Sequence, residues 1–311
     1  MKPILFCMPG QDALAHQLLT LTGWHEGGVV QRKFPDGETY IRVQDDVSDR
    51  DVVILCQLHH PDEKTLTLLL LADTLRDLGA RRVGLIAPYL AYMRQDKRFR
   101  EGEGISSHYY AKLIGNHLDW LLTVDPHLHR IHNLNEVYRI PAHAMTAVAP
   151  MADWIRRHVE KPLVIGPDSE SEQWAANVAQ AAGCPWEVLE KQRLGDRDVK
   201  ISLPHVEKYG DYTPVLVDDI VSTGKTMLHA SAHLRAAGMR PAICLAVHGI
   251  FAPGAAQEMQ SAGLTVVTCN SIADSSNQID LAPLLIEGLK MIEGLSVIEG
   301  LRVTGGLQKN L

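Results

Sequence analysis

Short runs of β-branched and other apolar residues alternate with amphipathic stretches along this chain, and that alternation is typical of parallel βαβ units. In the first half, two stretches with helical spacing of their apolar residues, 62–78 and 106–118, predict helices. The apolar runs around them predict strands at residues 4–7, 29–34, 52–56, 83–87 and 121–124.

The second half repeats the alternation, with strands predicted at residues 163–166, 186–189, 215–218, 243–247 and 265–268. Helices are expected at 171–182, 226–237, 253–262 and, last, 281–291. The Ala-rich stretch 141–150, bounded by prolines, is the best candidate for the junction between the halves. We therefore expect two α/β domains, each a mainly parallel sheet flanked by helices, over 1–145 and 146–285, and a C-terminal helix and tail over 286–311.

Length and composition agree with this division and narrow the class of protein. The 311 residues, 46% of them apolar, are enough for two ordinary domains with cores of their own. A formal net charge of −7 argues against a nucleic-acid-binding surface, which usually carries a basic patch. The longest apolar block, 66–72, is far short of a membrane span. Five scattered cysteines without a CxxC pair predict reduced core residues of a cytoplasmic protein.

The most informative motif is Val-Leu-Val-Asp-Asp-Ile-Val-Ser-Thr-Gly-Lys-Thr at 215–226, where an apolar strand leads into two carboxylates and a small-residue loop. Open α/β sheets bind ligands at the carboxyl ends of their strands, so Asp218 and Asp219 are placed to accept hydrogen bonds from the cis hydroxyls of a ribose. The loop then opens a helix, whose amino terminus favours a phosphate. The phosphate-binding residues predicted here are Ser222, Thr223, Gly224, Lys225 and Thr226.

A nucleoside-triphosphate P-loop is the competing interpretation, because Gly224-Lys225-Thr226 resembles the end of the GxxxxGK[ST] motif. The spacing excludes it. The leading glycine of that motif would fall at position 219, which is an aspartate whose charge would repel the phosphates.

Polar side chains also follow other predicted strands. Arg94 and Gln95 lie in the loop after strand 83–87, and His127 and His129 follow strand 121–124. An HxH pair can bind zinc, but no third and fourth ligand are evident nearby. One histidine with a carboxylate, for which Asp168 is the candidate, suits a magnesium polyphosphate better, since Mg²⁺ takes few protein ligands.

Two further segments carry candidate chemistry. Lys191 and Arg193 begin a charged stretch after strand 186–189, where a mobile loop could close over a transferring phosphate. The segment Phe-Pro-Asp-Gly-Glu at 34–38 has the composition of a β-turn, and it also offers an aromatic face and two carboxylates to a nucleobase.

In their order along residues 1–290, these motifs together resemble the ribose-phosphate pyrophosphokinases: Phe-Pro-Asp-Gly-Glu, Arg-Gln-Asp-Lys, Asp-x-His, Gly-Pro-Asp, Lys-x-Arg and Val-Asp-Asp-x-x-Ser-Thr-Gly-x-Thr. His248-Gly-Ile-Phe251 is similar to a segment that follows the ribose loop in that family, and the segment 98–107 resembles the archaeal members more closely. The resemblance implies tandem phosphoribosyltransferase-like (Rossmann-like) domains, with ATP on the N-terminal side, ribose 5-phosphate on the C-terminal side, and Mg²⁺ as cofactor.

Carried over position by position, the resemblance assigns a role to each candidate. Phe34 would stack on adenine while Asp36 and Glu38 read its polar edge, in a loop that this family supplies from a neighbouring subunit of a homo-oligomer. Arg94 and Gln95 would hold ATP. The remaining roles implied are metal and polyphosphate binding for His127 and Asp168, a catalytic loop for Lys191 and Arg193, and ribose 5-phosphate binding for Asp218, Asp219 and residues 222–226.

The sequence thus predicts transfer of the β,γ-pyrophosphoryl group of Mg-ATP to the anomeric hydroxyl of ribose 5-phosphate, giving phosphoribosyl pyrophosphate and AMP. Two alternatives stay open at this point. One is a phosphoribosyltransferase that consumes phosphoribosyl pyrophosphate, because it would share the ribose loop. The other is a non-catalytic regulatory homologue that binds nucleotides and joins catalytic subunits.

Overall fold

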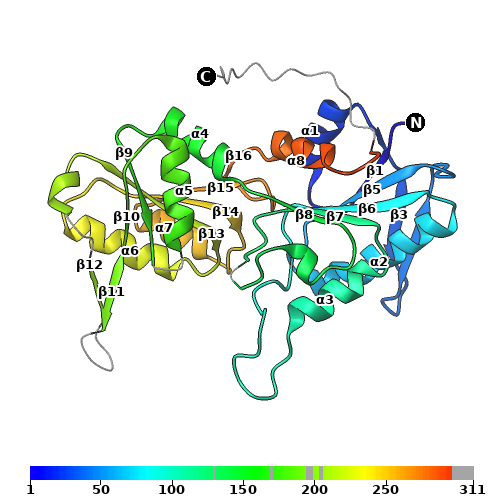
Figure 1. Ribbon diagram of the computed structural model, residues 1–311, viewed down its shortest axis with the longest axis horizontal. Coiled ribbons are helices and arrows are strands. Elements are labelled where there is room, and N and C mark those ends of the chain that lie inside the picture. The colour runs from blue at the N-terminus through cyan, green and yellow to red at the C-terminus, as the bar shows by residue number, and fades with distance from the viewer. Residues whose placement is uncertain (129, 169–170, 194–198, 203–205, 296–311) are drawn as a thin grey trace.

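The computed structural model describes residues 1–128, 130–168, 171–193, 199–202 and 206–295, and it forms two α/β domains side by side (Figure 1). Each domain is built on a six-stranded, fully parallel sheet. The strand orders are β2-β1-β5-β6-β7-β8 and β10-β9-β13-β14-β15-β16. This confirms the expected fold class.

The first domain contains the central strands that the sequence predicted, with bounds shifted by a residue at most. Its strands are β1 (Ile4–Cys7), β2 (His25–Glu26), β5 (Asp51–Leu55), β6 (Arg82–Ala87), β7 (Trp120–Val124) and β8 (Ala142–Met145). Its helices are α1 (Asp12–Thr22), α2 (Pro61–Asp77), α3 (Ser106–Gly115) and the short η1 (Leu134–Glu136). An antiparallel hairpin of β3 (Val29–Lys33) and β4 (Thr39–Val43) stands apart from the sheet.

The second domain follows the same plan. Its sheet strands are β9 (Pro162–Gly166), β10 (Trp186–Val188), β13 (Thr213–Val221), β14 (Ile243–Gly249), β15 (Thr265–Cys269) and β16 (Asn277–Ile279). Its helices are α4 (Val148–His158), α5 (Glu172–Ala182), η3 (Val206–Tyr209), α6 (Lys225–Ala236), α7 (Ala255–Ser261) and α8 (Ala282–Lys290). A second hairpin, β11 (Glu190–Arg193) with β12 (Val199–Ser202), projects from it (Figure 1).

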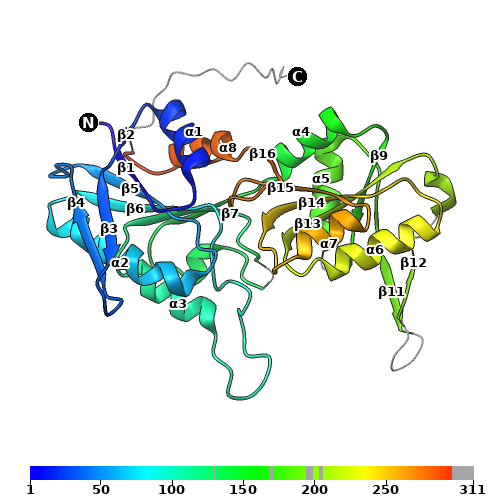
Figure 2. The same cartoon turned by 180° about the vertical axis from the view of Figure 1, so that it is seen from behind.

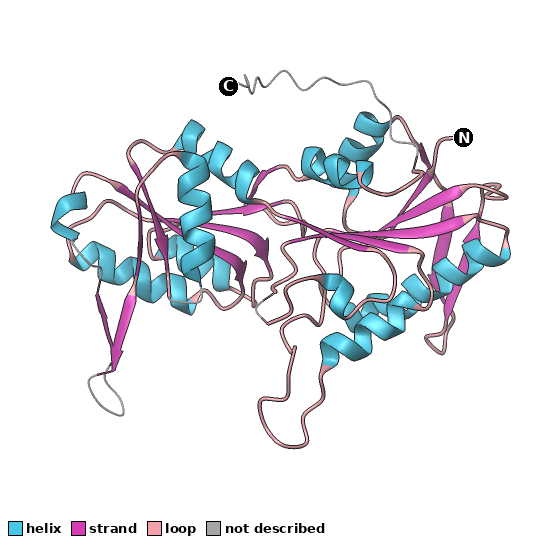
Figure 3. Ribbon diagram, viewed as in Figure 1, coloured by secondary structure: helices cyan, strands magenta, loops and turns pink. Residues whose placement is uncertain are grey.

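Apolar runs dominate the central strands because helices cover both faces of each sheet, as Figure 3 shows. All five residues of β5 and of β7 are buried, and so are Val215, Leu216 and Val217 of β13. A strand buried on both sides needs no polar alternation, which is why these strands could be located from the sequence.

The stretch 141–150, which the sequence analysis proposes as the junction, contains an edge strand of the first sheet and the start of the following helix. Residues Ala142–Met145 form β8, an edge strand paired with β7, and α4 begins at Val148. The sequence Ala-His-Ala-Met contains no β-branched residue, so it lacks the usual signal of a strand. Its pairing with β7, a tertiary interaction, supplies the stabilisation that local propensity does not.

The two domains share packing as well as a linker. Helix α8 follows the second sheet along the chain but packs against α1 and against β7 and β8 of the first domain (Figure 2). One apolar cluster contains Leu122 and Val124 from the first sheet together with Val215 and Leu245 from the second. The carboxyl ends of β7 and β13 are therefore held at a defined separation. Within the described part of the chain, no helix has the length and apolar content to span a bilayer.

Candidate functional site

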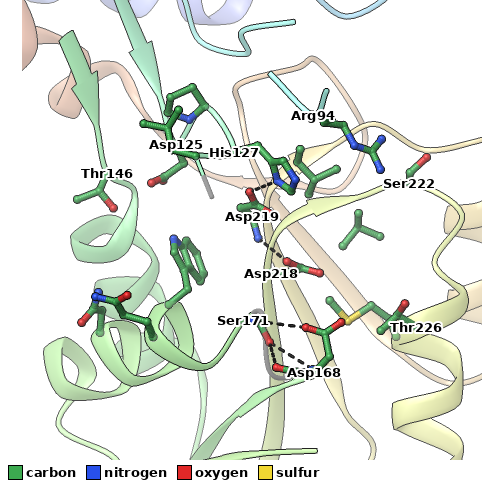
Figure 4. Close-up of a pocket in the computed structure, with 18 of the residues that line it drawn as sticks. Arg94, Asp125, His127, Thr146, Asp168, Ser171, Asp218, Asp219, Ser222 and Thr226 are labelled. Atoms are coloured by element: carbon green, nitrogen blue, oxygen red, sulfur yellow. Dashed lines mark hydrogen bonds and ion pairs between the residues drawn. The ribbon is translucent and has the colours of Figure 1, made fainter. Parts of the chain in front are cut away.

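A cavity of about 690 Å³ lies between the domains, at the carboxyl ends of β7, β9 and β13 (Figure 4). The first domain contributes Arg94 and the loop after β7, and the second contributes Asp168 and the loop between β13 and α6. The lining includes most of the residues singled out from the sequence: Arg94, His127, Asp168, Asp218, Asp219, Ser222, Thr223, Gly224, Lys225 and Thr226.

The loop of the second domain has the geometry of an anion site. Strand β13 continues to Val221, so Asp218 and Asp219 lie in its last residues, and α6 begins at Lys225. Gly224 caps that helix with a φ of 68°, in the left-handed region. A Cβ at this position would also lie 2.7 Å from the sulfur of Met259, so a larger residue would be both strained and crowded.

A hydrogen bond joins the two sides of the cavity. His127 Nδ1 lies 2.6 Å from Asp219 Oδ2, and each side chain is about one-fifth exposed (Figure 4). His127 comes from the first domain and Asp219 from the second. Burial opposes the ionisation of Asp219, but the hydrogen bond and charge of His127 outweigh it and lower the pKa of this carboxyl. Asp219 is therefore ionised, and Nδ1 is the donor.

Asp218 behaves in the opposite way. Its burial, with the neighbouring negative charges of Asp219 and Asp168, raises its pKa to about 8. The backbone N–H of Asp219 donates to Asp218 Oδ1 at 2.9 Å and opposes this shift only in part. Without a ligand, the pair therefore carries a single negative charge near neutral pH.

Asp125 is a third buried carboxyl of the site, and the sequence reasoning did not select it. Burial raises its pKa to about 6, against hydrogen bonds that include one of 2.7 Å from the Ala147 N–H. Its position directly after a buried strand could have identified it. Other lining residues lie directly after β8 or in α5, and no sequence signal marked them: Thr146, Gln173, Trp174 and Asn177.

Several residues that the sequence predicted for the site lie outside this cavity. Gln95 follows Arg94, but its Oε1 accepts a hydrogen bond of 2.6 Å from Ser106 Oγ at the start of α3. Phe34 directly follows β3, and its ring packs edge-on against Tyr40 and under the Arg32 guanidinium. Asp36 and Glu38 lie in the same hairpin turn, at the end of the first domain that faces away from the second (Figure 1).

Lys191 and Arg193 lie in β11, opposite Ile201 and Val199 of β12. The β11–β12 hairpin extends from the second domain beside the sheet (Figure 1). Their side chains fall outside the part of the chain that the structure describes, so the catalytic role assigned to them from the sequence stays a prediction. His129, the second histidine of the HxH pair, also lies outside the described residues.

Among the described residues, no three His, Cys, Asp or Glu side chains are arranged to hold a metal ion by themselves. The cavity does bring Asp168, Asp218 and Asp219 together with His127. Burial and, after it, the negative charges of Asp219 and Asp168 raise the pKa of Asp218, and a divalent cation would offset that charge. This donor set suits a cation that keeps most of its waters or shares phosphate ligands.

Comparison with known proteins identifies both domains. Residues 3–117 match the family model of the N-terminal domain of ribose phosphate pyrophosphokinase, and residues 133–285 match the phosphoribosyl transferase domain. A ribose-phosphate pyrophosphokinase of Methanobrevibacter smithii is 32% identical over 275 residues, which cover 84% of this chain and 91% of the relative. One from Sulfolobus acidocaldarius is 33% identical over 81% of this chain and 87% of the relative.

A solved structure agrees with these matches. The crystal structure of phosphoribosylpyrophosphate synthetase from Mycobacterium smegmatis superposes with a TM-score of 0.82 and 25% identity, covering 93% of this chain and 98% of that one. The similarity therefore extends over both domains and over their relative placement.

The raised pKa of Asp218 gives a testable dependence of stability on pH. The folded chain keeps a proton on Asp218 that the unfolded chain releases above about pH 4. The contribution of Asp218 to the free energy of unfolding of the unliganded protein therefore falls as pH rises from about 4 to about 8. Asp218→Asn removes the buried charge, and we expect it to raise Tm at pH 8 by roughly 2–4 °C or more, and by less at pH 6.

The control is Asp211→Asn, which removes an exposed carboxylate paired with Lys161. It should leave Tm at pH 8 unchanged or slightly lower. Thermal unfolding at both pH values measures these effects. A Tm gain of Asp218→Asn that is the same at pH 6 and pH 8 would contradict the account of the paired carboxylates.

Proposed function

This chain belongs to the ribose-phosphate pyrophosphokinase family, and we propose that its cavity transfers the β,γ-pyrophosphoryl group of Mg-ATP to the anomeric hydroxyl of ribose 5-phosphate. The products are phosphoribosyl pyrophosphate and AMP. The proposal rests on the composition of one cavity, in which the 218–226 segment of one domain faces Arg94 and His127 of the other. The relatives from Methanobrevibacter smithii and Sulfolobus acidocaldarius are named ribose-phosphate pyrophosphokinases.

Ribose 5-phosphate binds to the second domain in this proposal. Asp218 and Asp219 accept hydrogen bonds from the 2- and 3-hydroxyls, and the 5-phosphate lies at the amino terminus of α6, which begins at Lys225. Ser222 and Thr223 of the loop and Thr226 in the first turn of α6 add hydroxyl donors, and all three line the cavity.

ATP binds between the domains, with its polyphosphate near Arg94 and His127. The adenine needs a stacking surface, and Phe34 is 39% exposed. Because the Phe34 hairpin lies at the far end of its own domain, we propose that Phe34, Asp36 and Glu38 serve the site of a second subunit in a homo-oligomer with shared sites. Gln95 is also proposed to contact ATP, and its side chain accepts a hydrogen bond from Ser106 at the start of α3.

Mg²⁺ is the proposed cofactor, which Asp168 and His127 would hold together with the phosphates of ATP. When bound, it neutralises charge on the polyphosphate and on the carboxylates. The residues fit, because the cavity offers oxygen donors and an uncompensated negative charge but no closed protein cage.

All five cysteines are unpaired, which supports a cytoplasmic location.

Catalysis in this proposal is positioning and electrostatics, without a nucleophile from the enzyme. The anomeric hydroxyl oxygen attacks the β-phosphorus in line and loses its proton to the solvent, the bond from that phosphorus to the α–β bridging oxygen breaks, and AMP leaves with the bridging oxygen. Arg94 orients the polyphosphate, while Lys191 and Arg193 match the charge that develops on the transferred group.

The product balance of the purified chain tests the proposed function. With ATP, Mg²⁺ and ribose 5-phosphate, AMP and phosphoribosyl pyrophosphate should form in equal amounts, and AMP release should stop without the sugar phosphate. ADP as product would indicate an ordinary kinase. Reaction only with pyrophosphate and a nucleoside monophosphate would indicate a phosphoribosyltransferase. Binding of nucleotides without turnover would indicate a regulatory homologue.

Shared sites predict a specific behaviour of Phe34→Ala. The variant should stay folded and raise the KM for ATP roughly three- to tenfold, because an aromatic stacking contact is worth on the order of 1 kcal/mol. Leu78→Ala, which truncates an exposed apolar residue at the end of α2, should leave the KM for ATP unchanged.

Mixed oligomers make the same test sharper. When Phe34→Ala and Lys191→Ala chains are co-refolded, a mixed dimer contains one site with both residues intact, so about a quarter of the sites in an equal mixture should regain the normal KM for ATP, and the gain is measured as activity at ATP concentrations below that KM. Activity no greater than the sum of the two separate variants would exclude shared sites.

The hairpin residues should separate catalysis from binding. Lys191→Ala and Arg193→Ala should each lose about 10²–10³ in kcat, the usual cost of removing one preorganised charge donor. Interactions made only in the transition state lower kcat and kcat/KM together, so Kd values for both substrates and Tm should change little. Near-normal turnover, or a loss of binding in proportion to rate, would remove the catalytic role from this hairpin.

A further inference from the structure

His248 is a fully buried histidine that joins the two domains. It lies in β14, in register with Ile220 of β13, and has 0% exposure. Its Nε2 is 3.1 Å from the carbonyl oxygens of both Val124 and Asp125, at the end of β7 in the other domain. Carbonyl oxygens can only accept, so Nε2 carries the hydrogen and donates across the domain boundary.

The segment that His248 contacts has a strained backbone. Asp125 and His127 have φ values of 34° and 55°, in the left-handed region that residues other than glycine rarely adopt. The His127 N–H donates to the Asp125 carbonyl at 2.8 Å and closes a tight turn around Pro126. Such a conformation persists only when its surroundings hold it, and the hydrogen bonds from His248 are part of that restraint.

The residues that follow His248 hold the other side of the cavity. The Ile250 N–H donates to the Val221 carbonyl at 3.0 Å, and the Ala252 N–H donates to the Ser222 carbonyl at 3.2 Å. One five-residue segment, 248–252, therefore contacts the backbone of the His127 loop through a side chain and the backbone of the ribose-phosphate loop through its own N–H groups.

The surroundings of His248 keep its imidazole fixed and neutral. The Tyr89 ring packs edge-on at 5.0 Å, and Ser271 Oγ lies 2.8 Å from Nδ1. Burial lowers the pKa of His248 to about 4. The ring is therefore a constant hydrogen-bond donor at the pH of the cell, rather than a group that exchanges protons during turnover.

On the basis of the proposed function, we infer that His248 is a positioning residue for the reaction. Its hydrogen bonds fix the position of the His127 loop of one domain relative to the ribose-phosphate loop of the other. It acts through Val124 and Asp125 and needs no contact with substrate. Reacting groups misplaced by about 1 Å can cost on the order of 100-fold in rate, so loss of this donor should appear in kcat.

Two substitutions of matched size test the inference. His248→Phe keeps a ring against Tyr89 but removes the donor, and it should lower kcat about 10- to 100-fold. The Kd of ribose 5-phosphate should stay within about threefold, because residues 218–226 belong to the same domain as His248. His248→Gln carries an amide N–H of similar reach and should recover most of the lost kcat.

Thr268→Val is the control for loss of a buried hydrogen bond without a link to the other domain. Thr268 Oγ1 lies 2.7 Å from Ser276 Oγ, on the strand next to β14. Thr268→Val should lower Tm by about as much as His248→Phe but leave kcat unchanged. If His248→Phe does not fold, His248→Asn, whose amide is too short to reach Val124, replaces it.

A double-mutant cycle with His127→Ala identifies the route of the effect. If His248 acts through the His127 loop, His248→Phe should cost little further kcat in the His127→Ala background. Equal kcat losses for His248→Phe and His248→Gln, or a full additional loss in that background, would overturn the inference. An inactive wild-type chain would instead refute the proposed function, so the two failures are distinguishable.

Discussion

The hydrogen bond between His127 and Asp219 is the interaction on which the site depends, because it connects side chains from two separately built sheets at 2.6 Å. Neither domain alone contains a complete set of groups for pyrophosphoryl transfer. The first provides Arg94 and the imidazole of His127, and the second provides Asp218, Asp219 and a helix amino terminus. The shared apolar cluster and the return of α8 to the first domain fix the separation at which these groups meet.

The site concentrates negative charge at a cost in stability. Asp125 and Asp218 are buried carboxyls with raised pKa values, while Asp219 keeps its charge through His127. A hydrophobic or amide side chain at position 218 would be more favourable for the empty protein. Retaining carboxylates there is understandable if a cation and ribose hydroxyls provide the missing partners, and this links the electrostatics of the empty site to the chemistry proposed for it.

Much of this architecture could be predicted from the sequence, because long apolar strands and the Asp-Asp-x-x-Ser-Thr-Gly-x-Thr loop are local signals. Arg94 and His127 follow the neighbouring strands β6 and β7 and come together because parallel strands place their carboxyl ends at one edge, whereas Asp219 meets His127 through the packing of the two domains. Edge strand β8 and helix α4 were missed, since Ala142–Met145 gains its structure from pairing with β7. Trp174 and the bridging contacts of His248 depend on the domain arrangement, which no local pattern encodes.

The most direct test of the central claim is a crystal structure of the chain with ribose 5-phosphate, Mg²⁺ and α,β-methylene ATP, in which the bond to be broken is replaced by a stable one. The account expects the sugar hydroxyls on Asp218 and Asp219, the 5-phosphate at residues 222–226, and the triphosphate between Arg94 and His127. The anomeric oxygen should lie in line with the β-phosphorus. Substrates bound in separate places, or a triphosphate on the 222–226 loop, would contradict it.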